Sequence, residues 1–138
     1  MAYKVVDKES RLGSNAALCL FINKLSIDEF KAQITLFKVE EYFPEYKQGA
    51  TVNAVPNSAG ICCFRTMQNA EEWVAKNRIA MIPKFAIIKV RGKKKIRDPI
   101  FVCSCGAQAL SINELIKGNT TLPPPKGFIS FEKVKVLE

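Results

Sequence analysis

Short apolar runs separated by turn-forming residues dominate this sequence and leave few architectures open to it. Runs of this length that are rich in β-branched and aromatic residues favour strands over long helices. Strands are therefore predicted at residues 2–6, 34–42, 61–66, 84–92, 98–106 and 128–138. A further apolar run, residues 16–23, is typical of a buried strand, with a helical turn as the alternative. Residues 43–60 hold prolines, glycines and asparagines and are predicted to form the longest loop, a common place for binding.

Two stretches carry the spacing of a capping box, in which a hydroxyl and a carboxylate three residues apart satisfy the first amides of a helix. Ser26 and Glu29 form the first of these, and they predict a short helix over about residues 27–33. Ser111 and Glu114 form the second and predict another short helix.

Residues 66–77 show the clearest helical pattern in the chain. Thr66 has the hydroxyl of an N-cap, and apolar residues recur at helical spacing up to Val74. Trp73 belongs to this apolar face, which predicts that its ring packs in the core; base stacking is the alternative. The elements together predict one α+β domain over residues 1–138, with about six mostly antiparallel strands and two or three short helices on one face.

The last predicted strand changes phase along its length. Ile129 and Phe131 lie on one face of it, at the two-residue spacing of a strand. Val134 and Val136 keep the same spacing but are out of step with the first pair. A bulge near Glu132 is the predicted cause.

The chain contains no histidine, which excludes several kinds of function. A catalytic triad or a metal site that uses histidine is ruled out, so acid–base chemistry would have to use Glu, Asp, Lys, Tyr or Cys. The sequence has no Walker loop, no G-x-G-x-x-G motif, no helix-turn-helix and no aromatic RNA-binding motif. It therefore predicts no cofactor and no catalytic residue.

Five cysteines without a signal-peptide pattern predict an intracellular, cytoplasmic protein with free thiols. Cys62, Cys63, Cys103 and Cys105 form two close pairs, which raises the alternative of a zinc site. Zinc sites usually space paired cysteines two residues apart, and adjacent cysteines on a strand point to opposite faces. Buried, inert thiols are therefore the expected outcome, and no metal site is predicted.

The most concentrated charge in the chain is the segment "KVRGKKKIRDP", residues 89–99. It holds six cations, five of them within residues 91–97, and the whole chain has a net charge of +8. One interpretation is a hairpin with a charged tip, since exposed lysines discourage aggregation of strand edges. The other is a phosphate-binding site, in which cations gain affinity by releasing counterions. The candidate anion-binding residues are Arg91, Lys93, Lys94, Lys95 and Arg97.

Four segments, in order, resemble parts of the ADP-ribosyltransferase-like fold: "AYKVV", "GICCFRTMQNAEEW", "FAIIKVRG" and "KGFISFEKVKVL". The resemblance implies a cleft of the size of a nucleotide. Where that family has an arginine or histidine on its first strand, this chain offers Lys4. Where it has a catalytic glutamate at the late strand, Glu132 comes several residues later. The resemblance therefore implies a catalytic set that is incomplete.

The leading functional hypothesis is a small basic binding domain without catalysis, whose partner is anionic: a nucleic acid backbone, a nucleotide or an acidic protein surface. No membrane partner is expected. The first alternative is an NAD-using enzyme of the ADP-ribosyltransferase type. The second is an inhibitor or adaptor that docks on an acidic protein.

Overall fold

The fold is known from a computed structural model, which describes residues 1–13, 24–38, 40–56, 60–76, 85–97, 101–102, 121–122 and 125–137. For residues 101–102 and 121–122 only the backbone is described. The strands are β1 (Ala2–Asp7), β2 (Thr51–Asn53), β3 (Ile61–Phe64), β4 (Phe85–Lys95), β5 (Phe101–Val102), β6 (Thr121–Leu122) and β7 (Phe128–Val136). The helices are α2 (Ile27–Leu36), α3 (Met67–Lys76) and the short 3₁₀ helix η1 (Glu40–Tyr42).

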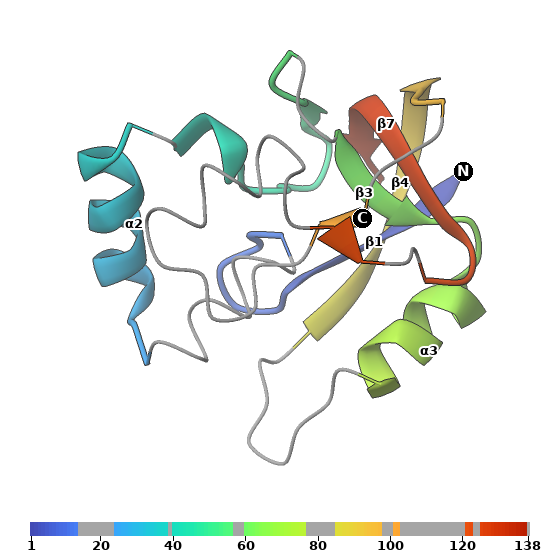
Figure 1. Cartoon of the computed structure of the whole chain (residues 1–138), viewed down its shortest axis with the longest axis horizontal. Coiled ribbons are helices and arrows are strands. Elements are labelled where there is room, and N and C mark those ends of the chain that lie inside the picture. Colours follow the sequence, from blue (N-terminus) through green and yellow to red (C-terminus); the bar gives the residue numbers. More distant parts are fainter. Residues whose placement is uncertain are drawn as a thin grey trace.

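Five of the strands form one antiparallel sheet that closes on itself into a small barrel (Figure 1). Their order is β2-β7-β3-β1-β4, and a further pairing joins β4 to β7. Val90 on β4 shows how the closure works, because its Cα is partnered by Ala2 of β1 and also by Val136 of β7. Strands β5 and β6 pair separately with each other.

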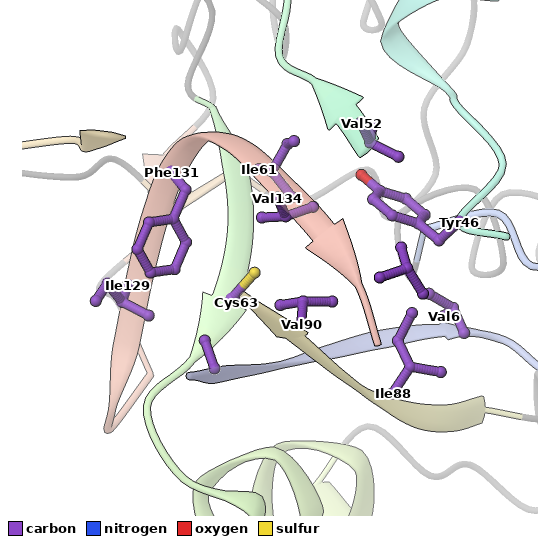
Figure 2. Packing of buried hydrophobic residues seen from close by; sticks show 12 residues of the cluster. Val6, Tyr46, Val52, Ile61, Cys63, Ile88, Val90, Ile129, Phe131 and Val134 are labelled. Carbon is purple, nitrogen blue, oxygen red and sulfur yellow. The ribbon is translucent and has the colours of Figure 1, made fainter. Parts of the chain in front are cut away.

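Alternate residues of the strands point inward and fill the barrel. Figure 2 shows side chains such as Val6, Cys63, Val90 and Val134 pointing toward one another between the curved strands. The four are essentially inaccessible to solvent. At about 25 cal/mol per Å² of apolar surface, this burial is the main contribution that stabilises the barrel.

Helix α3 packs on the outer face of the sheet (Figure 1). Trp73 is buried there, and its ring centroid lies 6.0 Å from that of Phe64 and 5.6 Å from that of Phe85. The Thr66 hydroxyl accepts a hydrogen bond of 3.1 Å from the Asn69 amide and so caps the helix. Both sequence predictions for this segment, the cap and the buried tryptophan, are confirmed.

Helix α2 begins with the predicted capping box. The Ser26 hydroxyl accepts from the Glu29 amide at 3.1 Å, and the Glu29 carboxylate accepts from the Ser26 amide at 3.2 Å. The strand predicted at residues 34–42 is wrong, because α2 continues to Leu36 and η1 follows. Phe30 and Ile34 are one helical turn apart and both buried, so packing of this face outweighs the local strand preference.

The helices do not share one face of the sheet. Phe30 of α2 contacts Phe43, which follows η1, with their ring centroids 5.3 Å apart and nearly perpendicular. In Figure 1, α2 lies on the far side of the molecule from α3. The prediction of helices on one face is therefore wrong, whereas the α+β class and the approximate number of strands are confirmed.

The predicted loop at residues 43–60 contains a short strand, β2, which pairs with β7. The predicted phase change in β7 is present, because Ile129, Phe131 and Val134 all belong to the barrel core. The pairing of β4 with β7 keeps the same register on both sides of this point, so no bulge residue is inserted there.

Several predictions fall wholly or mainly outside the described residues. These are the apolar run at residues 16–23, the helix after Ser111 and most of the strand at residues 98–106. Among the helices that the structure describes, none has the length and apolar character needed to cross a membrane.

Candidate functional site

One interpretation of the sequence made the basic segment the tip of a hairpin. The described part of this segment is instead mostly strand. Strand β4 continues through it to Lys95, and Arg91 and Lys93 are Cα partners of Lys135 and Lys133 on β7. Gly92, between these two cations, occupies an inward position of the strand. Gly92 lies opposite Val134, which belongs to the core, so the inward positions of both strands continue the barrel.

The pairing of β4 with β7 brings four cations together, and we call Arg91, Lys93, Lys133 and Lys135 the cationic strand pair. Because successive side chains of a strand point to opposite faces, these four project outward where their neighbours fill the core. Lys133 is half-buried and the other three are exposed. Like charges that lie directly opposite each other destabilise a strand pair, so some other factor must account for their placement here.

The remaining three candidate residues lie beside the cationic strand pair in sequence. Lys94 has a positive φ of 56°, which is uncommon for a residue with a side chain and breaks the regular alternation of the strand. Lys94 and Lys95 are both exposed. Arg97 is exposed just beyond the end of β4.

Acidic side chains do not neutralise this surface within the part of the chain that the structure describes. The ion pair found there joins Lys47 and Glu45 over 3.8 Å, and both side chains belong to the segment before β2. Glu132 is exposed next to Lys133 in sequence but forms no ion pair with a described residue. Among the described residues, therefore, no acidic side chain pairs with the cationic strand pair, which presents positive charge to solvent.

A second unusual group lies in the barrel wall. Lys4 on β1 is only 6% exposed, although lysine is rarely buried. Its Nζ donates a hydrogen bond of 2.9 Å to the carbonyl oxygen of Cys62 and lies 5.2 Å from the centre of the Tyr46 ring. These two contacts replace part of the hydration that the ammonium loses on burial. This lysine is therefore a structural group that points into the protein.

The thiols beside Lys4 are poor nucleophiles. Burial raises the pKa of Cys63 to about 12, and the Lys4 ammonium only partly opposes this effect. Burial also raises the pKa of Cys62. Cys63 belongs to the core cluster and Cys62 is half-buried next to it on β3, so the two point to opposite faces. The predicted inert thiols fit this arrangement, while Cys103 and Cys105 lie outside the described residues.

No family model, no curated protein and no solved structure matches this chain. The resemblance to the ADP-ribosyltransferase-like fold therefore stays a prediction. Of the two residues that it implicates, Lys4 is buried with its ammonium bound to a backbone carbonyl, and Glu132 is exposed on β7.

Sequence reasoning found one side of the cationic strand pair and missed the other. Lys133 and Lys135 alternate with Val134 and Val136, which is the pattern of a half-buried strand. That pattern indicates which residues face solvent, but it does not indicate which strand lies alongside. Only the pairing of β4 with β7 shows that the two basic segments are neighbours.

Proposed function

We propose that the protein binds nucleic acid through its phosphate backbone, at the cationic strand pair. The observation that supports this most strongly is the pairing of Arg91 with Lys135 and of Lys93 with Lys133. Each pair destabilises the free protein because like charges repel. A ligand with regularly repeated negative charge would relieve this repulsion on binding and would gain affinity from it.

A polyanion suits this surface better than a single small anion. The cations follow two neighbouring strands, with successive outward side chains on a strand roughly 7 Å apart, and so form two short rows. The absence of ion-paired carboxylates from these rows, among the described residues, favours a partner whose charge has one sign throughout. Because the contacts are to phosphates, little dependence on base sequence is expected.

Salt dependence of binding tests this proposal directly. Four phosphate contacts to a single strand should give a slope of roughly −3 for the logarithm of the association constant against the logarithm of salt concentration. Fluorescence anisotropy with a labelled oligonucleotide, over a series of salt concentrations, measures this slope. An affinity that is absent, or that does not change with salt, would remove the proposal.

Matched variants distinguish binding at the cationic strand pair from a general effect of the protein's net positive charge. The double variant Arg91→Ser and Lys135→Ser removes two charges from the cationic strand pair, and the slope should fall in magnitude by about 1.4. The control is Lys8→Ser with Lys31→Ser, which removes the same charge from exposed positions after β1 and on α2. If both double variants weaken binding equally, net charge alone explains the affinity.

The two alternative functions give different results in simple experiments. An adaptor that docks on an acidic protein would keep its partner after nuclease treatment of a pull-down. An enzyme of the ADP-ribosyltransferase type would release or absorb heat on titration with NAD, and it would lose activity in Glu132→Gln. The nucleic acid proposal predicts neither result.

A further inference from the structure

An aromatic residue adjoins the cationic strand pair on the same outer face. Tyr3 of β1 is the Cα partner of Lys89 of β4. Lys89 precedes Arg91 by two residues and so faces the same way, roughly 7 Å earlier along the strand. Tyr3 alternates with the inward residues Ala2 and Lys4 and therefore also points outward.

The Tyr3 ring lies at the border between the packed and the open part of this face. It packs against the cluster of Val5, Phe64 and Trp73 beneath α3, yet it is only half-buried. Within the described residues, Tyr3 forms no ring-to-ring contact, unlike Trp73 with its two aromatic neighbours. An anchored tyrosine that keeps exposed surface beside a row of cations has the properties of a platform for a base.

We propose that the ligand is single-stranded nucleic acid and that one of its bases stacks on Tyr3, while adjacent phosphates contact Lys89 and Arg91. This inference rests on the proposed function and narrows it. A base can stack on a protein ring only when it is free of its own helical stack, which a duplex does not permit without unstacking. Stacking of this kind is tolerant of sequence, since every base has a flat face.

The test compares three probes of similar length: a single-stranded oligonucleotide, the corresponding duplex and inorganic polyphosphate, which has charge but no bases. Tyr3→Leu should weaken binding of the single strand by about 10-fold or more and leave binding of polyphosphate unchanged. Tyr3→Phe should retain the affinity, because it keeps the ring. Tyr42→Leu is the matched control, since Tyr42 is also half-buried but belongs to η1.

Several outcomes would overturn the inference. One is that the duplex binds the native protein as tightly as the single strand does. Another is that Tyr3→Leu leaves the preference for single strand over polyphosphate unchanged. Failure of the proposed function would give different results. Polyphosphate would then not bind at all, or it would bind the double variant Arg91→Ser and Lys135→Ser as tightly as the native protein.

A measurement on the native protein guards against unfolding of Tyr3→Leu, since Tyr3 contributes to packing beneath α3. An oligonucleotide containing 5-iodouracil, which crosslinks on irradiation to aromatic rings stacked on it, is bound and irradiated. The attached peptide is then identified by mass spectrometry. Attachment at Tyr3 supports the inference, and attachment only at other residues contradicts it.

Discussion

Lys93 of β4 lies directly opposite Lys133 of β7 on the outer side of the barrel. The pairing of β4 with β7 is also the one that closes the sheet. The closing pair of strands therefore contains a repulsion between like charges, at the position where we place the ligand. Binding and stability are coupled at this position, since a change that relieves the repulsion also removes a contact to phosphate.

Replacement of Lys93 by glutamate should raise stability and lower affinity for nucleic acid. The new carboxylate would form an opposite-charge pair with Lys133, a change worth about 0.5–1 kcal/mol in the free energy of unfolding. Urea unfolding at low ionic strength measures the gain, which salt should reduce because Lys93 is exposed. Lys93→Gln removes the repulsion without adding attraction. Its free energy of unfolding should therefore lie between those of the native protein and Lys93→Glu. A glutamate variant that is less stable than the glutamine variant would contradict this account.

Glycine at position 92 is required by the ring of Phe131. A Cβ atom on Gly92 would overlap the Phe131 ring, which lies over this point of β4. We expect Gly92→Ala to lower the free energy of unfolding by about 1–3 kcal/mol, the range for overpacking of a core. Gly13→Ala is the control, because a Cβ there has no neighbour closer than 3.8 Å.

A double variant identifies the ring as the cause. Phe131→Leu combined with Gly92→Ala should be more stable than the sum of the two single effects predicts, since the leucine leaves room for the new methyl group. Strictly additive effects would show that Gly92 is needed for another reason.

Local signals predicted the parts of the fold that local interactions decide. The capping box of Ser26 and Glu29, the cap at Thr66 and the burial of Trp73 each depend on residues within a few positions of one another. The end of α2 was mispredicted because residues 34–42 contain β-branched and aromatic side chains, and only the burial of Ile34 beside Phe30 decides in favour of helix.

The arrangement of the candidate site could not be predicted from such local signals. A run of cations in a sequence is typical both of a turn and of an outward-facing strand edge, and the choice depends on the partner strand. In β4 that partner is β7, about forty residues later, and its Val134 provides the inward neighbour that keeps Gly92 in a strand. The role proposed for Tyr3 depends in the same way on its pairing with Lys89.

Lys4 should tolerate replacement by methionine better than by alanine. Lys4→Ala removes the donor to the Cys62 carbonyl, which costs on the order of 1–3 kcal/mol, and leaves a cavity, which costs about 2–5 kcal/mol. Lys4→Met also loses the donor, but it fills the space and removes a buried charge. The free energy of unfolding of Lys4→Met, measured with urea, should therefore lie between those of the native protein and Lys4→Ala. Equal losses in the two variants would show that the hydrogen bond alone matters.

Stability should fall at alkaline pH because of the buried Cys63 thiol. Its ordinary pKa of 9.0 applies to the unfolded chain, and burial raises it to about 12 in the folded protein. Above pH 9 the unfolded chain loses a proton that the folded chain keeps, so unfolding becomes more favourable as pH rises toward 12. Below pH 9 both forms are protonated and this contribution is constant. The buried Tyr46 hydroxyl, whose pKa is also raised by burial, should add to the loss above pH 10.

Two variants assign the loss to these groups. Cys63→Ala should flatten the decline in the free energy of unfolding between pH 9 and 12, even if it lowers stability at pH 7, because the titrating thiol is gone. Tyr46→Phe should flatten the decline only above pH 10, the ordinary pKa of tyrosine. Urea unfolding at half-unit steps of pH provides both curves. A decline of the same steepness in Cys63→Ala and in the native protein would show that the thiol reaches solvent and titrates equally in both states.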